Sequence, residues 1–141
     1  MAEKIKAYMM RVDEETGQVY KGYMGEIKNT LEAKQKYVNF DKPNGLIQVV
    51  CIEGIDIICH DEGKLLQYPA NRVLMIEDEV ADVFCGNILA VRHNDEGEFI
   101  SILPEDIVTI NKFLKPVYKV GTKLIIIPSE DWLEDYKETS I

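Results

Sequence analysis

The stretch "LIQVVCIEGIDIICHD" (residues 46–61) places two apolar, β-branched segments on either side of the pair Glu53-Gly54. Short runs of Val and Ile favour β-strands, and a pair such as Glu-Gly between them is typical of a tight turn. Because the apolarity is nearly continuous rather than alternating, both strands are expected to be buried on two faces. The stretch therefore predicts an antiparallel hairpin at the centre of a sheet.

The segments around this hairpin predict a domain in which strands outnumber helices. Further strands are predicted at residues 4–12, 18–27, 83–94, 98–102 and 117–128, and helices, from capping residues and helical spacing, at 29–38, 104–115 and 130–138. Pro69 favours an irregular crossing segment at 64–76 over a central strand, and the acidic residues 77–82 are expected to form a loop or a single helical turn. The expected fold is α+β, a mostly antiparallel sheet built from hairpins with two or three helices on one face.

The composition is that of one soluble domain: 141 residues, of which 46% are apolar and 29% are charged. We expect a domain at 1–116 and a C-terminal part at 117–141 that packs on the domain or in a dimer interface. The net charge of −9 disfavours non-specific binding to nucleic acids or anionic membranes, because both need a basic surface. Without a long apolar segment or a signal peptide, the protein is expected in the cytoplasm. The three cysteines form no C-x-x-C pair, so no disulfide framework, metal or cofactor is expected.

Three related phrases recur along the chain: "CHDEGKL" at 59–65, "RHNDEGEF" at 92–99 and the looser "DEETG" at 13–17. If His60 and His93 met beside their acidic neighbours, they could hold a metal or act in acid/base catalysis. The third copy, however, has no histidine. Asp can accept a hydrogen bond from the backbone two residues on, and Gly supplies a positive φ, so turn chemistry accounts for the repeated positions. We therefore interpret 61–63 and 95–97 as hairpin loops.

Two segments supply polar side chains beside apolar strands, "YPANR" at 68–72 and "CGNILAVR" at 85–92. The guanidinium of Arg72 offers donors in a fixed fork that suits a carboxylate or a phosphate. Alternatively, Arg72 is structural and pairs with a carboxylate such as Glu77 or Asp82. If the first segment crosses the second, one pocket is lined by the candidate ligand-binding residues Tyr68, Asn71, Arg72, Asn87 and Arg92.

The acidic segment "SEDWLEDYKE" (129–138) is a candidate surface for a protein partner. Its carboxylates could imitate the phosphates of a nucleic acid and so engage a basic protein, but charge runs also occur as solvated faces. The apolar side chains of its predicted helix either pack on the domain or meet a second subunit. The candidate partner-binding residues are Trp132, Glu130, Asp131, Glu134 and Asp135.

Several of these phrases together resemble the pattern of a family of small bacterial domains of unknown function that is met on prophages, plasmids and conjugative elements. The matching parts are "NTLEAKQKYV", "GLIQVV", "CHDEGKL", "PANR", "CGNILAV" and "DEGEFISI". The resemblance covers roughly residues 5–115, and "PANR" and "CGNILAV" are its most specific parts. His60 stands where Asn is usual in the family, and the C-terminal part extends past the family pattern.

The resemblance implies an accessory protein of a mobile element and no particular reaction. Two functions fit: a non-catalytic counter-defence binder that sequesters a small anionic or nucleotide-like molecule, or an acidic inhibitor that binds a host nucleic-acid-binding defence protein by charge mimicry. The sequence contains no P-loop, G-x-S-x-G or H-E-x-x-H motif and nominates no catalytic residue. An enzyme that acts on a small nucleotide is nevertheless kept as a third functional class. An edge strand such as 119–127 can pair across a twofold axis, so a homodimer is expected.

Overall fold

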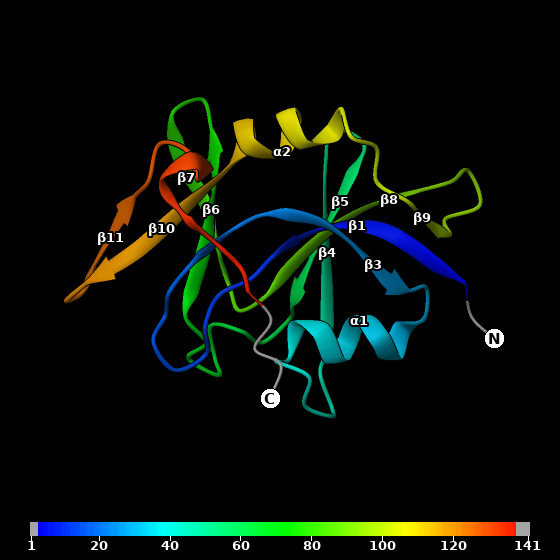
Figure 1. Cartoon of the computed structure of the whole chain (residues 1–141), viewed down its shortest axis with the longest axis horizontal. Helices are drawn as coiled ribbons and strands as arrows, with labels where there is room; N and C mark the ends of the chain where they lie inside the picture. The colour runs from blue at the N-terminus through cyan, green and yellow to red at the C-terminus, as the bar shows by residue number, and fades with distance from the viewer. Residues whose placement is uncertain (1–2, 138–141) are drawn as a thin grey trace.

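The computed structural model of the chain describes residues 3–137 and consists mainly of strands (Figure 1). In chain order the elements are β1 (Lys4–Met10), β2 (Tyr20–Lys21), β3 (Tyr23–Lys28), α1 (Leu31–Val38), β4 (Ile47–Ile52), β5 (Ile55–His60), β6 (Ala70–Ile76), β7 (Glu79–Cys85), β8 (Ile88–His93), β9 (Phe99–Ile100), α2 (Asp106–Phe113), β10 (Leu114–Val120), β11 (Lys123–Ile126), the 3-10 turn η1 (Glu130–Trp132) and β12 (Glu134–Asp135). No helix among these residues has the length and the apolarity that crossing a membrane requires.

The strands form two main sheets. The central sheet has six strands in the order β3-β1-β8-β5-β4, with β9 paired to the end of β8, and the second sheet has four in the order β11-β10-β6-β7. Every pairing within these two sheets is antiparallel, and only the short pair of β12 with β2 is parallel. The prediction of a mostly antiparallel α+β fold is therefore confirmed.

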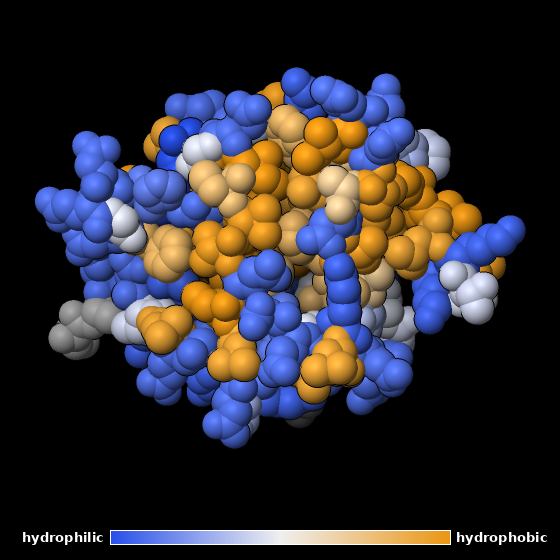
Figure 2. All heavy atoms as spheres, turned by 180° about the vertical axis from the view of Figure 1, so that it is seen from behind, coloured by the Kyte–Doolittle hydropathy of each residue, from blue (hydrophilic) through white to orange (hydrophobic). Residues whose placement is uncertain are grey.

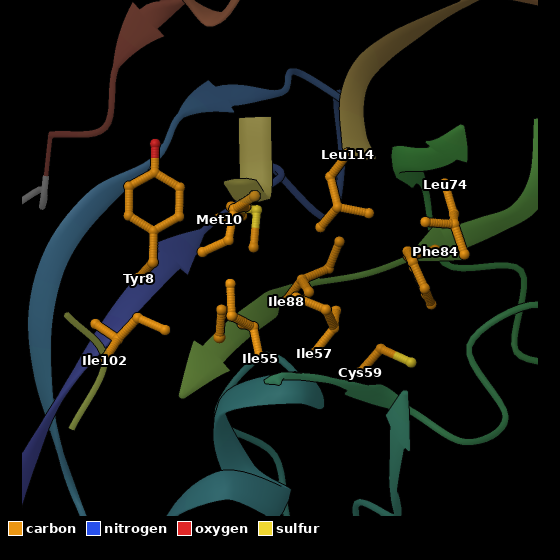
Figure 3. Packing of buried hydrophobic residues seen from close by; sticks show 12 residues of the cluster. Tyr8, Met10, Ile55, Ile57, Cys59, Leu74, Phe84, Ile88, Ile102 and Leu114 are labelled. Carbon is orange, nitrogen blue, oxygen red and sulfur yellow. The ribbon is translucent and has the colours of Figure 1, made fainter. Parts of the chain in front are cut away.

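Side chains alternate along the central strands so that both faces of the central sheet are apolar. On β5, Ile55 and Ile57 share one core with Leu74 and Leu114 of the second sheet, whereas Ile58 belongs to the core beneath α1. Figure 3 shows the first of these cores, between the two sheets. Both faces of the central sheet need a cover, so α1 lies on one face while the second sheet and α2 lie on the other. The prediction that the helices share one face is not confirmed.

The β4–β5 hairpin forms as predicted. Its turn has positive φ angles at Glu53 (52°) and Gly54 (81°), which two consecutive residues of a type I′ turn require. β5 is central and fully buried, but β4 lies at the sheet edge with several side chains exposed, so the central position predicted for both strands holds only for β5. The predicted cap of α1 is also present, because the hydroxyl of Thr30 accepts a hydrogen bond of 3.1 Å from the N–H of Ala33.

The prediction of an irregular segment at 64–76 is wrong for its second half. β6 begins directly after Pro69 and lies between β10 and β7 in the second sheet. Pro69 therefore never needs to donate to a ladder, and its carbonyl accepts from the N–H of Gly86 at 2.8 Å. The acidic residues 77–82 are not a loop but the turn and first part of the β6–β7 hairpin, with positive φ at Glu77 (52°) and Asp78 (65°).

The predicted helix at 130–138 is also wrong, and residue 138 lies outside the described residues. Ser129 caps the segment as expected, because its hydroxyl accepts a hydrogen bond of 3.1 Å from the N–H of Asp131. Only one 3-10 turn follows, and the chain then extends to form β12 beside β2. The segment pairs with β2 and inserts the side chain of Glu130 into the interior. These contacts replace the hydrogen bonds that a helix would make.

The three repeated phrases form turns in which a side chain at the start of the turn accepts a hydrogen bond from the backbone N–H two residues on. Asp13 Oδ1 and Asn94 Oδ1 accept such hydrogen bonds at 2.9 and 3.0 Å, and Gly17 and Gly97 have positive φ. In the remaining copy the acceptor is the ring nitrogen Nδ1 of His60, at 2.9 Å. The imidazole thus takes the place of an Asn side chain, and its proton is on Nε2.

The loop predicted at 95–97 is the β8–β9 hairpin, but the loop predicted at 61–63 does not join two strands of a hairpin. Here the chain leaves β5 in the central sheet and reaches β6 in the second sheet. Gly63 is needed for space rather than for positive φ, because a Cβ atom at this position would lie 2.8 Å from the carbonyl oxygen of Cys85.

Replacing His60 with Asn is expected to reduce the loss of stability in mild acid. Burial lowers the pKa of His60, against the opposing effect of Glu62 and Asp61, so the unfolded chain binds this proton more readily than the folded chain. The contribution of His60 to stability is therefore complete above its unfolded pKa of about 6.5 and is lost as the pH falls through the lower folded pKa. Urea denaturation at several pH values should show that the free energy of unfolding decreases less with falling pH for His60→Asn than for the natural chain. Equal decreases would contradict the role of His60 as the group whose protonation destabilises the fold.

Candidate functional site

Asn71 joins the second sheet to the central sheet through hydrogen bonds that are wholly buried. Its Nδ2 donates to the carbonyl oxygens of Met10, at the end of β1, and Gly86, before β8, both at 2.9 Å. Its Oδ1 accepts from Nη1 of Arg72 at 2.6 Å. Buried backbone carbonyls need hydrogen-bond donors, and Asn71 supplies them at the point where β6, β1 and β8 meet.

Arg72 has no exposed surface, which is rare for a charged side chain. Besides Asn71, its guanidinium donates from Nη2 to the carbonyl oxygen of Tyr20 at 3.0 Å, and the same nitrogen lies 3.5 Å from Oε1 of Glu130. Its Nε has no hydrogen-bond partner among residues 3–137. Burial lowers the pKa of Arg72, while the carboxylate of Glu130 acts in the opposite direction. Arg72 therefore depends on Glu130 for a compensating charge.

The buried carboxylate of Glu130 is surrounded by donors from separate elements. The hydroxyl of Tyr8 donates to both of its oxygens, at 3.0 and 2.9 Å, and the N–H of Gly22 donates to Oε2 at 2.7 Å. Gly22 is required by space, because a Cβ atom there would lie 2.3 Å from the ring of Tyr8. Burial, followed by the charge of Glu130, raises the pKa of Tyr8, which keeps its hydroxyl a donor. Tyr8, Gly22 and Arg72 together form a receptor for one anionic group.

Asn87 performs a similar structural task nearby. Its Oδ1 accepts from the N–H of Val12 at 3.0 Å, and its Nδ2 donates to the carbonyl oxygen of Tyr37 at 3.4 Å. Asn87 also lines a small cavity of about 190 Å³ together with Arg11. The guanidinium of Arg11 lies between the rings of Tyr37 and Tyr136, 4.9 and 4.7 Å from their centres.

Arg92 lies away from the other predicted residues, at the far end of β8. It lies five positions after Asn87, which in a strand is roughly 17 Å. Its Nε and Nη2 each donate to a different carboxylate oxygen of Asp106, both at 2.6 Å, and these bonds lower the pKa of Asp106. Arg92 thus attaches the start of α2 to the central sheet.

Tyr68 covers the C-terminal end of α1. Its hydroxyl is hydrogen-bonded to Oδ1 of Asn39, and its ring meets the rings of Phe40 and His60 edge-on. Thus, within residues 3–137, the five candidate ligand-binding residues are distributed over separate places rather than around one pocket. Asn71 and Arg72 are bonded to each other, and the other three bind separate partners.

The candidate partner-binding residues divide into one buried residue and four exposed ones. Glu130 is buried, whereas Trp132 is 73% exposed, and Asp131, Glu134 and Asp135 are exposed as well. We use the name C-terminal segment for residues 129–136, which contain all five. Besides the Glu130 contacts, β12 holds this segment to β2, and the ring of Tyr136 stacks on that of Tyr23 at 5.9 Å.

The two histidines lie on different strands and have different partners. His60 accepts from its own turn, and Nδ1 of His93 lies 2.7 Å from Oδ2 of the buried Asp56. Within residues 3–137, no group of three or more His, Cys, Asp or Glu side chains is arranged to hold a metal ion.

Tyr8 and Gly22 were not predicted from the sequence as parts of the anion receptor, and the partners predicted for Arg72 were Glu77 and Asp82. Tyr8 belongs to an apolar strand in which a tyrosine gives no separate signal. A glycine at position 22, between two residues of strand-forming type, was the one local hint of a close approach. The long-range pairing with Glu130 leaves no local pattern.

Residues 6–116 match the model of a family described as "Domain of unknown function (DUF3846)". No match was found among the curated proteins or among the solved structures. The matched residues include Asn71, Arg72 and Asn87, whereas β11 and the C-terminal segment with Glu130 lie beyond them.

Proposed function

The chain belongs to this family, and we propose that it is a non-catalytic accessory protein that binds a basic protein partner through its C-terminal segment. The setting that we propose is the one that the sequence resemblance implies, a mobile element whose product counters a host defence. The observation that carries the proposal is the exposure of Trp132 among the carboxylates of Asp131, Glu134 and Asp135.

A side chain as large and apolar as Trp132 is a typical anchor of a protein interface. Trp is enriched among the residues that dominate binding energy, and such anchors work best when charged residues surround them at the rim. The three exposed carboxylates around Trp132 would attract a basic surface and speed association.

The C-terminal segment is held in place without the help of a partner. Glu130 is inserted into the receptor formed by Tyr8, Gly22 and Arg72, directly before Trp132. A binding surface that is ordered in advance loses less conformational entropy on association. The buried ion pair thus supports a binding role for the residues that follow it.

The proposal predicts that truncating Trp132 abolishes tight binding while the fold is kept. Proteins captured from a bacterial lysate by the natural chain would be purified and titrated calorimetrically against variants. Trp132→Ala should bind about thirty-fold more weakly, since loss of an interface anchor costs about 2 kcal/mol or more. Neutralisation by Asp131→Asn, Glu134→Gln and Asp135→Asn should weaken binding and flatten its dependence on salt.

A matched control removes three exposed carboxylates elsewhere, by Glu26→Gln, Asp95→Asn and Glu96→Gln. This variant has the same net charge as the neutralised C-terminal segment and should bind as the natural chain does. Equal weakening by both triple variants would show that only the overall charge matters and would reject the C-terminal segment as the binding surface.

A second candidate function, sequestration of a small anionic ligand, is favoured by one observation. The donors of Tyr8, Gly22 and Arg72 converge on a single carboxylate, and Nε of Arg72 is left without a partner in the part of the chain that the structure describes. A ligand with a carboxylate or phosphate group would use the same donors if it displaced Glu130. In that case the Asn71-Arg72 pair would both stabilise the fold and bind the anionic group of the ligand.

This candidate predicts that Glu130→Ala creates an anion site that inorganic phosphate fills. Phosphate should raise the melting temperature of Glu130→Ala, leave that of the natural chain nearly unchanged, and have no effect on Glu130→Ala combined with Arg72→Met. If folded Glu130→Ala shows no response to phosphate or acetate, the receptor serves the structure alone.

A further inference from the structure

The hairpin of β10 and β11 extends beyond the body of the protein with apolar side chains on both faces. β11 pairs with β10 and with no other strand in the described part of the chain, and all its residues are exposed (Figure 1). The apolar residues of the hairpin that are between 37% and 55% exposed are Tyr118, Val120, Leu124, Ile125 and Ile126. Two-stranded hairpins are marginally stable in water, so such a surface is expected to be covered.

The hairpin is also basic, unlike the rest of the chain. Residues 107–129 contain four lysines and no acidic residue, so the net charge of −9 divides into +4 on this part and −13 on the remainder. Lys119 and Lys123 lie on the exposed part of the hairpin. The apolar, positively charged hairpin fits a partner surface that is apolar and has acidic side chains at its edge.

The protein itself has an apolar cleft with two acidic residues in its lining. A cleft of about 670 Å³ lies between the β6–β7 turn, the end of α2 and β11, and its apolar lining is formed by Met75, Ile76, Phe113, Ile126 and Pro128. Glu77 and Asp78 lie at one side of the cleft, and Lys112 and Lys115 at another. Figure 2 shows apolar side chains gathered across the middle of the face seen from behind and outward over the β10–β11 side.

We propose that two copies of the chain form a homodimer in which each β10–β11 hairpin covers the cleft of the other copy. By the register of the hairpin, Tyr118 is paired with Ile125, and Val120 with Lys123, so these side chains share one face. This face supplies apolar side chains for the cleft, and Lys123 on the same face meets Glu77 and Asp78 of the second copy. Lys119 lies on the opposite face and adds to the positive charge of the hairpin.

A second copy fits better than another occupant because both halves of the contact are on one chain. Under twofold symmetry each copy gives a hairpin and receives one, so both exposed surfaces are covered and the assembly closes. Direct pairing of two β11 strands, which the sequence alone suggests, would instead bring the lysines of the two hairpins together and leave both clefts open.

The test is sedimentation equilibrium of the full chain with charge variants that leave the core unchanged. The natural chain should be a dimer. Lys119→Glu with Lys123→Glu should weaken dimerisation at least tenfold, and so should Glu77→Asn with Asp78→Gly. The latter pair suits the positive φ angles of the turn, so a loss of dimer cannot be attributed to unfolding. Combining the two lysine changes with Glu77→Lys and Asp78→Lys should restore the dimer.

The matched control is Lys4→Glu with Lys28→Glu, two exposed lysines that face each other on β1 and β3, and it should leave the dimer unchanged. A natural chain that stays monomeric at its highest soluble concentration would overturn the proposal. A dimer that is kept or tightened by Lys119→Glu with Lys123→Glu would also overturn it and would indicate edge-to-edge pairing. Trp132→Ala should leave the dimer intact, so this test is separate from that of the proposed function.

Discussion

The structure depends on the buried ion pair between Arg72 and Glu130. Removing two charges from water is costly, and the cost is offset only when hydrogen bonds satisfy both groups. Here Asn71 and Tyr20 bind the guanidinium while Tyr8 and Gly22 bind the carboxylate. Among these partners, Tyr8 belongs to the central sheet and Asn71 to the second sheet, so the ion pair connects the two sheets.

This interaction also joins the part of the chain that matches the family to residues beyond that part. Arg72 lies within the part that matches the family, whereas Glu130 lies beyond that part. Without Glu130, the domain would enclose an uncompensated charge. The same contact that neutralises Arg72 fixes Trp132 at the surface, so the buried charge determines where the proposed binding surface lies.

The sequence predicted what local patterns determine and missed what distant contacts determine. The β4–β5 hairpin and the Thr30 cap follow from neighbouring residues, and both form. The prediction from Pro69 failed because a proline just before a strand leaves the hydrogen bonds of that strand intact. The same residue inside β6 would have interrupted the sheet. For Arg72 the sequence offered carboxylates close along the chain, whereas the actual partner is 58 residues away. No local signal reveals such a pairing.

Arg72 is a buried charge whose place in the fold depends on Glu130, and a double-mutant cycle of these two residues measures that dependence. Urea denaturation would give the free energy of unfolding of the natural chain, Arg72→Met, Glu130→Gln and the double variant. Arg72→Met should cost about 3–5 kcal/mol in the natural chain, because it leaves the carboxylate buried alone. In the Glu130→Gln background the same change should cost little or should stabilise the protein. An equal cost in both backgrounds would contradict the claim.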